Sequence, residues 1–462
     1  MSISQSFTRH IVPATGKSCG LLGIHLIRMF LWLSHHHNRL RLYRWSVTFG
    51  GFAVVQLLVQ LLNAGAGFLL VRTLDKPDYA WFTIASSMSA ALAVLADAGI
   101  IHAVTSIGGG VWQNKASLKG VVIAALRLRM KLSAFASVLV AAISIWLLLR
   151  NGAGLPASLA LTLLVVAPIW HIATTSIFSG VNRLHSRARQ LQVADLVPAL
   201  VRAVLTAALA LLGRLSPITA LLAVLFAHLT QYGIVRFQVL PLLGGVAPSN
   251  VVMHTEHIWK VVQQLLPNCI FICVQGQIAT WLISVFATAS EVSDLGALNR
   301  LAIIFAVLAG PLAQFVFPAF ARARDKKRLR AIAFALVAGT TLFSATVLIF
   351  AGWHGDWFLW ILGGKYTHLQ GELLLVLTGM ALTNLAGYVW ALNAARGWNH
   401  LAWLNIPLTL AAQTTAAFLL PLNTVAGLAW FTITTASVQC SYALLSCIRG
   451  FSHDPCSSPT PA

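Results

Sequence analysis

The stretch SVTFGGFAVVQLLVQLLNAGAGFLLVRTLDKPDYA, residues 46–80, contains the pattern that decides the fold. Its first part, residues 46–71, carries no Asp, Glu, Lys or Arg. About 20 apolar residues in a helix are enough to cross a hydrocarbon core about 30 Å thick. Charged residues return at once in the turn that follows: Arg72, Asp75, Lys76 and Asp78. The stretch therefore predicts a transmembrane helix that ends in a short, charged turn.

The same pattern recurs along the whole chain. Apolar residues make up 58% of the 462 residues, charged residues only 9%, and the mean hydropathy is +0.80. Soluble domains carry about 25% charged residues, so most of this chain is expected to lie in lipid. We predict an all-α integral membrane protein with twelve transmembrane helices, at 46–71, 79–100, 131–149, 156–178, 194–213, 217–236, 261–286, 295–318, 331–351, 371–392, 401–420 and 424–447.

The basic residues predict which side of the membrane each loop occupies. With these twelve helices, 24 of the 31 Lys and Arg residues fall on one side. Short cytoplasmic loops are enriched in Lys and Arg, so this side is expected to be cytoplasmic and both termini with it. A net charge of +20 would indicate nucleic acid in a soluble protein, but here the basic residues are spread among loops. We therefore expect contact with membrane lipids and none with nucleic acid.

The chain is predicted to consist of two halves of six helices each. Residues 1–45 form a basic segment that we interpret as cytoplasmic or interfacial. The halves are expected at 46–237 and 258–447, with a cytoplasmic linker at 238–257 and a tail at 448–462. Because both halves begin in the cytoplasm, they are expected to be six-helix bundles related by a pseudo-two-fold axis along the membrane normal.

Amide side chains mark one face of the first helix in each half. Gln56, Gln60 and Asn63 share a face of the first helix, since they are spaced four and three residues apart. A second stripe lies on the seventh helix and consists of Gln264, Asn268 and Gln275. Amides cannot face lipid without losing hydrogen bonds, so these stripes face other helices or water. Hydrogen bonding between helices is one interpretation, and a shared hydrophilic cavity is the other.

Few ionisable residues lie within the predicted helices, and each is a candidate for function. Arg202 lies in the fifth helix, and Arg72 and Arg300 lie at the outer ends of the first and eighth. The guanidinium group binds phosphate through two parallel hydrogen bonds, so these three are candidate ligands for a diphosphate. Asp97 and Asp195 are candidates for ion coupling, although either could instead pair with an arginine. Neither a metal site nor a cofactor is expected.

Several dispersed motifs resemble those of the polysaccharide (O-antigen) flippases of the multidrug/oligosaccharidyl-lipid/polysaccharide exporter superfamily. Residues 70–80 resemble the family's Arg-x-Leu followed by Pro-Glu-Tyr-Gly, with Asp78 and Ala80 replacing Glu and Gly. Asp97-Ala98-Gly99 is similar to its Asp-x-Gly. Residues 295–301 resemble its Gly-x-Tyr-x-x-Ala-x-Arg-Leu without the tyrosine, and residues 360–366 its Leu-x-Gly-x-x-Tyr. The resemblance covers residues 46–447.

The resemblance implies a function as well as a fold. It implies two bundles in a V around a cavity lined chiefly by the first, second, seventh and eighth helices. It further implies that an undecaprenyl-diphosphate-linked oligosaccharide moves from the inner to the outer leaflet of the bacterial inner membrane by alternating access. Partners would be the lipid-linked oligosaccharide, membrane lipids and other polysaccharide-assembly membrane proteins.

Two alternatives remain open. A drug or cation antiporter of the same superfamily would need acidic residues in its cavity, and the predicted helices contain only Asp97 and Asp195. A membrane polysaccharide polymerase or glycosyltransferase would expose a substantial outer loop or paired acidic residues. The longest predicted outer loop, 352–371, contains a single acidic residue, Asp356. We therefore expect a transporter and not an enzyme.

Overall fold

Every regular element in the described part of the chain is helical. The computed structural model describes residues 39–323, 325–398 and 402–453. Residues 53–462 form one compact unit, and the preceding residues are a separate one. Most of the expected interfacial segment at 1–45 and the end of the expected tail lie outside the described residues.

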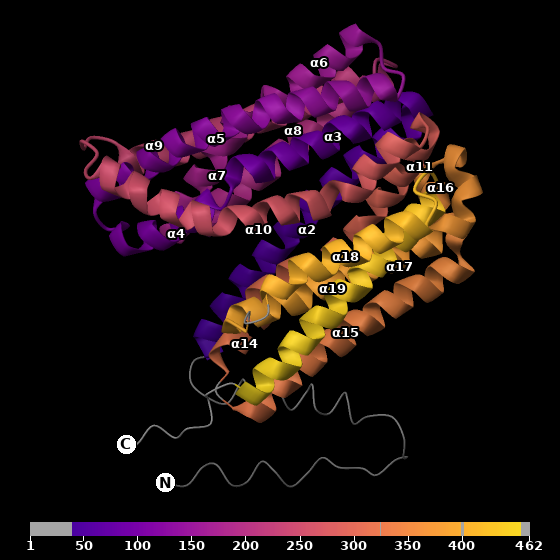
Figure 1. Cartoon of the computed structure of the whole chain (residues 1–462). Coiled ribbons are helices and arrows are strands. Elements are labelled where there is room, and N and C mark those ends of the chain that lie inside the picture. The colour runs from indigo at the N-terminus through magenta and orange to yellow at the C-terminus, as the bar shows by residue number, and fades with distance from the viewer. Residues whose placement is uncertain (1–38, 324, 399–401, 454–462) are drawn as a thin grey trace. The chain divides into compact units, whose positions relative to one another are not determined.

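The helices of the first half follow the predicted spans closely (Figure 1). The last of them ends at Leu243, and seven residues separate it from the next helix, within the predicted linker between the halves. Their bounds are α2 (Arg39–Thr73), α3 (Lys76–Asp97), α4 (Ile100–Val111), α5 (Lys115–Arg150), α6 (Leu155–Val166), α7 (Ile169–Leu184), α8 (Ala188–Leu211) and α9 (Pro217–Leu243).

The second half begins with a long helix and continues through several short ones. Its bounds are α10 (Val251–Phe286), α11 (Ala289–Asn299), η1 (Arg300–Ala302), α12 (Ile303–Ala306), α13 (Ala309–Pro311), η2 (Leu312–Val316), α14 (Phe317–Arg322), α15 (Lys326–Trp353), α16 (Gly355–Leu362), η3 (Gly364–Leu369), α17 (Gln370–Arg396), α18 (Ala402–Leu419) and α19 (Val425–His453). Figure 1 shows α15, α17, α18 and α19 together in one bundle.

Local sequence explains where several helices begin and end. Asn114 caps α5 by accepting hydrogen bonds from two backbone N–H groups of its first turn, and Ser216 forms a capping box with Thr219 at the start of α9. The second crossing is divided at Gly99, whose φ of 84° suits a residue without a Cβ atom. The fourth is divided at Pro168, which stands between α6 and α7.

The predicted eighth span differs from a single helix. Residues 295–318 are divided among α11, η1, α12, α13, η2 and α14, and η2 has π-helical hydrogen bonding. Gly310 and Pro311 lie immediately before η2. Proline has no N–H to donate and clashes with the preceding turn, so a Gly-Pro pair is a physical cause of the break.

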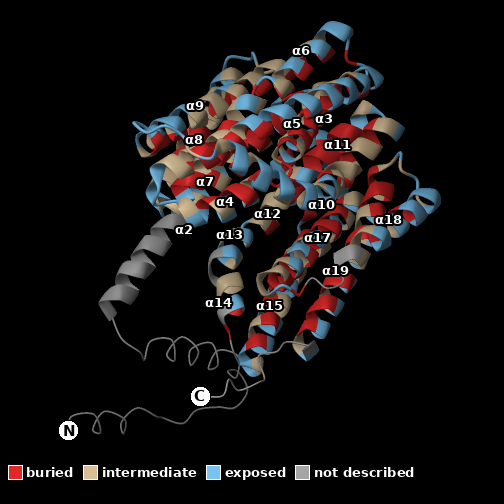
Figure 2. Ribbon diagram, turned by 60° about the vertical axis from the view of Figure 1, so that its left-hand side comes forward, coloured by how far each residue is buried: buried red, intermediate tan, exposed pale blue. Residues whose placement is uncertain are grey.

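The all-α, multi-pass membrane architecture is confirmed. Ten helical segments in the described residues are long and apolar enough to cross a membrane. The two expected crossings outside this group are the broken eighth span and α18, whose 18 residues follow a gap in the described chain. Figure 2 shows exposed residues on α5, α6 and α9, and many of the exposed residues of the molecule are large and apolar. Examples are Phe135, Leu211 and Phe237, which are suited to contact with lipid.

Three apolar clusters hold residues 53–462 together. The largest lies at the end of the molecule where Arg72 is found and combines residues of both halves, among them Leu70, Leu298 and Leu362. At the opposite end, one cluster joins α4, α5, α7, α9 and the start of α10, and a separate one joins α14, α15, α17 and α19. The two halves therefore share one core at the Arg72 end, whereas at the other end the first half packs with the start of α10 in one core and α14, α15, α17 and α19 form another.

Candidate functional site

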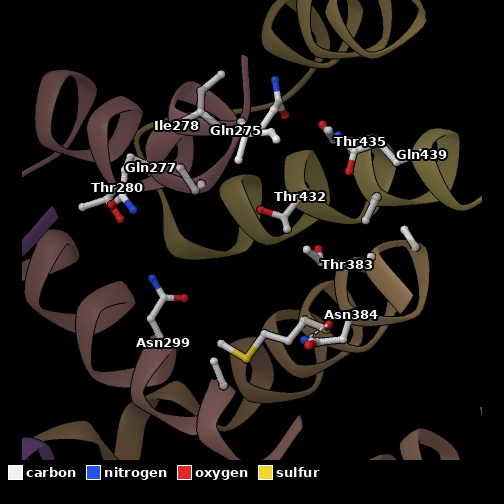
Figure 3. Close-up of a pocket in the computed structure, with 18 of the residues that line it drawn as sticks. Gln275, Gln277, Ile278, Thr280, Asn299, Thr383, Asn384, Thr432, Thr435 and Gln439 are labelled. Carbon is white, nitrogen blue, oxygen red and sulfur yellow. Dashed lines mark hydrogen bonds between the residues drawn. The ribbon is translucent and has the colours of Figure 1, made fainter. Parts of the chain in front are cut away.

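A cavity of about 730 Å³ lies among α3, α10, α11, η1, α17, α18 and α19. A volume of this size is typical of a site for a small organic ligand. Figure 3 shows Asn299, Thr383 and Thr432 facing the same space from three different helices. Leu295, Val376 and Ala429 belong both to the cavity wall and to the shared apolar core. The shared core therefore borders the cavity towards the Arg72 end.

The polar part of the cavity wall is almost entirely uncharged. Among the lining residues that the structure describes, Arg300 is the single Lys or Arg and none is Asp or Glu. Aromatic surface comes from Trp390 and Tyr442, with Phe271 and Phe431. The uncharged polar side chains are Thr83, Ser86, Ser87, Asn268, Gln275, Gln277, Thr280, Asn299, Thr383, Asn384, Asn405, Gln413, Thr432, Thr435 and Gln439.

Many of these polar groups already use their protons within the protein. The hydroxyls of Thr383, Thr432 and Thr435 each donate to the backbone carbonyl four residues earlier, at 2.8–2.9 Å. The Asn384 amide nitrogen likewise donates to the Met380 carbonyl at 2.9 Å. A hydroxyl has two acceptor lone pairs and an amide oxygen has two more. These groups therefore present acceptors to the cavity, while amides such as Asn299 and Gln439 also keep N–H donors, so the wall suits a ligand with many hydroxyl groups.

Two amides on the cavity wall pair with each other. Gln275 donates to the side-chain oxygen of Gln413 at 3.1 Å, and Gln413 donates to that of Gln275 at 2.7 Å. The pair joins α10 to α18. Each glutamine keeps one N–H and part of its oxygen's capacity for another partner. The reciprocal bonds hold both amides in fixed orientations at the edge of the cavity.

Arg300 lies where the cavity meets the interface between the halves. Its Nε donates to the Tyr79 hydroxyl at 3.0 Å, and that hydroxyl donates to the Gly296 carbonyl at 3.2 Å. Its guanidinium group also lies 5.6 Å from the ring centre of Phe82. None of the ion pairs between described residues includes Arg300. Its charge is therefore held in place without a carboxylate to neutralise it.

The structure places the two predicted amide stripes differently. Asn268 and Gln275 line the cavity, whereas Gln264 is exposed outside the lining. Gln56, Gln60 and Asn63 are half-buried and also lie outside the lining. Asn63 instead accepts a hydrogen bond from the Arg202 Nη1 at 3.5 Å. The resemblance implied a wall from the first, second, seventh and eighth helices. Among the described lining residues α3, α10 and α11 contribute and α2 does not, and α17, α18 and α19 contribute as well.

The remaining predicted ionisable residues lie outside the cavity lining. Arg202 lies on α8 and its Nε is buried without a hydrogen-bond partner. Asp195 on the same helix is exposed and accepts from Gln231 at 3.5 Å. No ion pair joins these two residues in the described structure. Arg72 is exposed and donates to the Trp360 carbonyl, and its guanidinium lies 4.8 Å from the Trp360 ring centre.

Asp97 is paired with an arginine that the sequence did not single out. Its Oδ1 lies 2.8 Å from the Arg129 Nη1, and the side chains are 22% and 3% exposed. The angles of this contact fall outside the hydrogen-bond range, so it is a close ion pair rather than a directed hydrogen bond. It joins the end of α3 to α5.

The polar residues of α17 and α19 were not identified from the sequence as part of a cavity. Thr432, Thr435 and Gln439 are spaced three and four residues apart, which places them on one face of α19. This spacing is the signal that could have found them. Threonine is common in apolar helices because its hydroxyl bonds to the backbone of the preceding turn, so the pattern is easily assigned to packing.

Comparisons with known proteins bear on the fold. Within the described residues, no group of three or more His, Cys, Asp and Glu side chains could hold a metal ion. No protein-family model matches the chain, and a search of curated proteins found no match. Solved structures do match, at low sequence identity and with high coverage.

One such structure is the inward-facing conformation of a multidrug resistance MATE family transporter of the MOP superfamily, with 15% identity, a TM-score of 0.70 and coverage of 88% of this chain and 100% of that one. A second structure is the outward-facing conformation of a multidrug resistance MATE family transporter of the MOP superfamily. It has 13% identity and a TM-score of 0.60, with coverage of 87% of this chain and 94% of that one. A MOP superfamily transporter from Pyrococcus furiosus, described as having a binding pocket of reverse polarity that suggests a different function, has 14% identity, a TM-score of 0.62 and coverage of 86% and 92%. The chain thus has the fold of the MATE transporters of the MOP superfamily.

Proposed function

We propose that this protein is a flippase that moves an undecaprenyl-diphosphate-linked oligosaccharide from the inner to the outer leaflet by alternating access. The fold supports a transporter, because its structural neighbours are described as transporters in inward-facing and outward-facing conformations. We further propose that it lies in the bacterial inner membrane with both termini cytoplasmic and serves polysaccharide or lipopolysaccharide assembly. Its partners would be membrane lipids and other proteins of that assembly.

The cavity wall is the observation that carries this proposal. It combines many uncharged hydrogen-bond acceptors with one cation and, among the described lining residues, no carboxylate. Sugar hydroxyls are donors and match such acceptors. Sugar rings also pack against aromatic faces such as those of Trp390 and Tyr442.

Arg300 is the proposed first ligand of the diphosphate. It is the cation on the cavity wall and has no carboxylate partner among the described residues. Its free Nη groups can bind phosphate oxygens through strong, charge-assisted hydrogen bonds. We propose that Arg202 and Arg72, which lie outside the lining in this conformation, contact the diphosphate at other stages of transport. The ion-coupling roles proposed for Asp97 and Asp195 are likewise assigned to other stages.

A drug or cation antiporter is the second candidate, and one observation favours it. Two of the structural neighbours are described as multidrug resistance transporters. A cation in a cavity of low dielectric constant would need a carboxylate, and the described lining contains none. The polarity of this wall therefore favours the flippase over the antiporter.

Glycan rescue tests the proposal at Arg300. The gene is expressed in a strain that lacks its own lipid-linked oligosaccharide flippase, and surface glycan is measured. Loss of one charged hydrogen-bonding group costs about 1.5–3 kcal/mol. We therefore expect Arg300→Gln to lower the initial rate of glycan display about 10- to 100-fold, and Arg300→Lys to lower it less.

The matched control is Arg214→Gln, which removes a cation from an exposed position in a predicted outer loop. It should leave glycan display unchanged at equal membrane abundance. Failure of the wild-type protein to rescue any lipid-linked glycan, together with protection of an efflux-deficient strain against cationic drugs, would replace the flippase by the antiporter.

A further inference from the structure

Charged residues of the two halves meet at the Arg72 end of the molecule. The Nζ atom of Lys76, the first residue of α3, lies 2.7 Å from Oδ1 of Asp294 on α11. The Nε2 atom of His368 on η3 lies 2.9 Å from Oδ2 of the same carboxylate. We call these three residues the outer latch, because the charge distribution of the loops predicts that this end faces outward.

Burial gives the outer latch more weight than a surface ion pair. The Asp294 side chain is only 4% exposed, and that of Lys76 is 26% exposed. A buried carboxylate that loses its partners pays a large desolvation penalty. The nearby pair of Lys365 and Asp75 is different, since its atoms are 3.6 Å apart and Asp75 is 87% exposed. Exposed pairs of this kind contribute little.

Further contacts across the same interface bring the two halves close together. The Lys365 Nζ donates to the Leu74 carbonyl at 2.8 Å, and Arg72 donates to the Trp360 carbonyl. Tyr79, which is fully buried, donates to the Gly296 carbonyl. These bonds connect the turn after α2 and the start of α3 to α11, α16 and η3.

The apolar cores indicate what the latch controls. The halves share a core at the Arg72 end, whereas at the other end α4, α5, α7, α9 and the start of α10 form one core and α14, α15, α17 and α19 form a separate one. Leu295, which follows Asp294 directly, belongs both to the shared core and to the cavity wall. For the cavity to open towards the Arg72 end, α3 must move away from α11. That movement would separate Lys76 from Asp294.

We propose that Lys76, Asp294 and His368 form an ionic latch that keeps the cavity closed at its expected outer end. Asp294 is the central residue, because its two oxygens contact Lys76 on α3 and His368 on η3. Opening requires water or substrate to replace these contacts. The inference rests on the alternating access of the proposed function but not on the identity of its substrate.

Accessibility of an engineered cysteine tests the latch in the full-length protein. The native cysteines are replaced, and the reporter is Asn299→Cys, since Asn299 is an exposed residue on the cavity wall next to the interface. Intact cells receive a membrane-impermeant thiol reagent from outside. Breaking a buried pair shifts a two-state equilibrium towards the state that does not need it. We expect Asp294→Asn and Lys76→Gln each to raise the labelling rate at least about tenfold.

A charge exchange guards against unfolding as the explanation. The double variant with Lys76→Asp and Asp294→Lys restores opposite charges and should return the labelling rate to within about threefold of the parent. Asp75→Asn is the matched control, because it removes an exposed carboxylate of the same turn, and it should not change the rate.

Equal labelling in the parent, Asp294→Asn and Lys76→Gln would overturn the latch, as would an equal increase with Asp75→Asn. Failure of the charge exchange to lower the rate below that of both single variants would also overturn it. Size-exclusion profiles establish that the single variants are folded. The labelling experiment needs no glycan, so its result does not depend on glycan rescue. It tests the latch, whereas glycan rescue tests the proposed flippase.

Discussion

Asp97 and Arg129 form an ion pair between α3 and α5 at the end of the molecule opposite Arg72. Arg129 is 3% exposed, so its charge depends on this carboxylate. Removing one partner of a buried ion pair is far more costly than replacing both by apolar groups of similar size. The pair could therefore hold the two helices together, transmit an ion, or do both.

The stability of single and double variants distinguishes these roles. We expect Arg129→Met to lower the free energy of unfolding by about 3 kcal/mol, because Asp97 loses its partner. The double variant with Asp97→Leu should recover most of that loss. Thermal unfolding of the purified protein in detergent provides the measurement. A stable Asp97→Asn variant that no longer transports would instead assign ion coupling to Asp97.

Residue patterns predicted part of the cavity and missed the rest for a physical reason. Asn268, Gln275 and Arg300 were found because amides and guanidinium groups in an apolar helix need partners outside it. Thr383 and Thr432 satisfy themselves by donating to their own helix. Their hydroxyl oxygens can still accept hydrogen bonds from a ligand, but nothing in the sequence distinguishes them from threonines that only pack against other helices.

The helices of the second half show that proline alone does not break a transmembrane helix. Pro267 lies within α10 and Pro407 within α18, and both helices continue through it. At Gly310 and Pro311 the helix divides and a π-helical turn follows. The sequence predicted a crossing at 295–318 but not the break, because the outcome depends on how neighbouring helices satisfy the freed carbonyl groups.

Amide hydrogen exchange tests the cause of this break. Replacing Gly310 and Pro311 by Ala removes a helix penalty of about 1 kcal/mol for glycine and about 3 kcal/mol for proline. We expect exchange across residues 303–318 to slow at least about tenfold, because a continuous helix protects its N–H groups. Pro407→Ala in α18 is the control and should leave exchange across 303–318 unchanged. Unchanged exchange in the double variant would assign the break to tertiary packing.

For the molecule as a whole, every predicted span falls in a helical region, although the second, fourth and eighth are divided among shorter helices and several helices extend beyond the predicted ends. The ends differ because apolar runs report the hydrocarbon thickness, whereas α5 and α10 continue as helices into the polar region. The sequence did not predict that seven helical segments line the cavity, because this depends on how the halves pack. Hydropathy cannot separate a wet surface from one that faces lipid.

Two engineered cysteines separate these surfaces in the native membrane. Phe418 is 86% exposed on α18, whereas Thr432 lines the cavity. In a background without native cysteines, Thr432→Cys should react with a small polar thiol reagent at least about tenfold faster than Phe418→Cys, because thiolate forms only where water is present. Gln60→Cys tests in the same way whether the amide stripe of α2 is wet. Equal protection of all three positions would contradict a hydrated cavity.

The apolar core shared by the two halves has a consequence for the energy balance of a cell. Fully buried side chains such as Leu70, Leu298 and Leu362 occupy the space between the halves at the Arg72 end. An apolar barrier without voids offers ions no continuous file of water molecules. The protein in this conformation would therefore not let protons leak across the membrane, even though it contains a cavity of about 730 Å³ with polar groups in its wall.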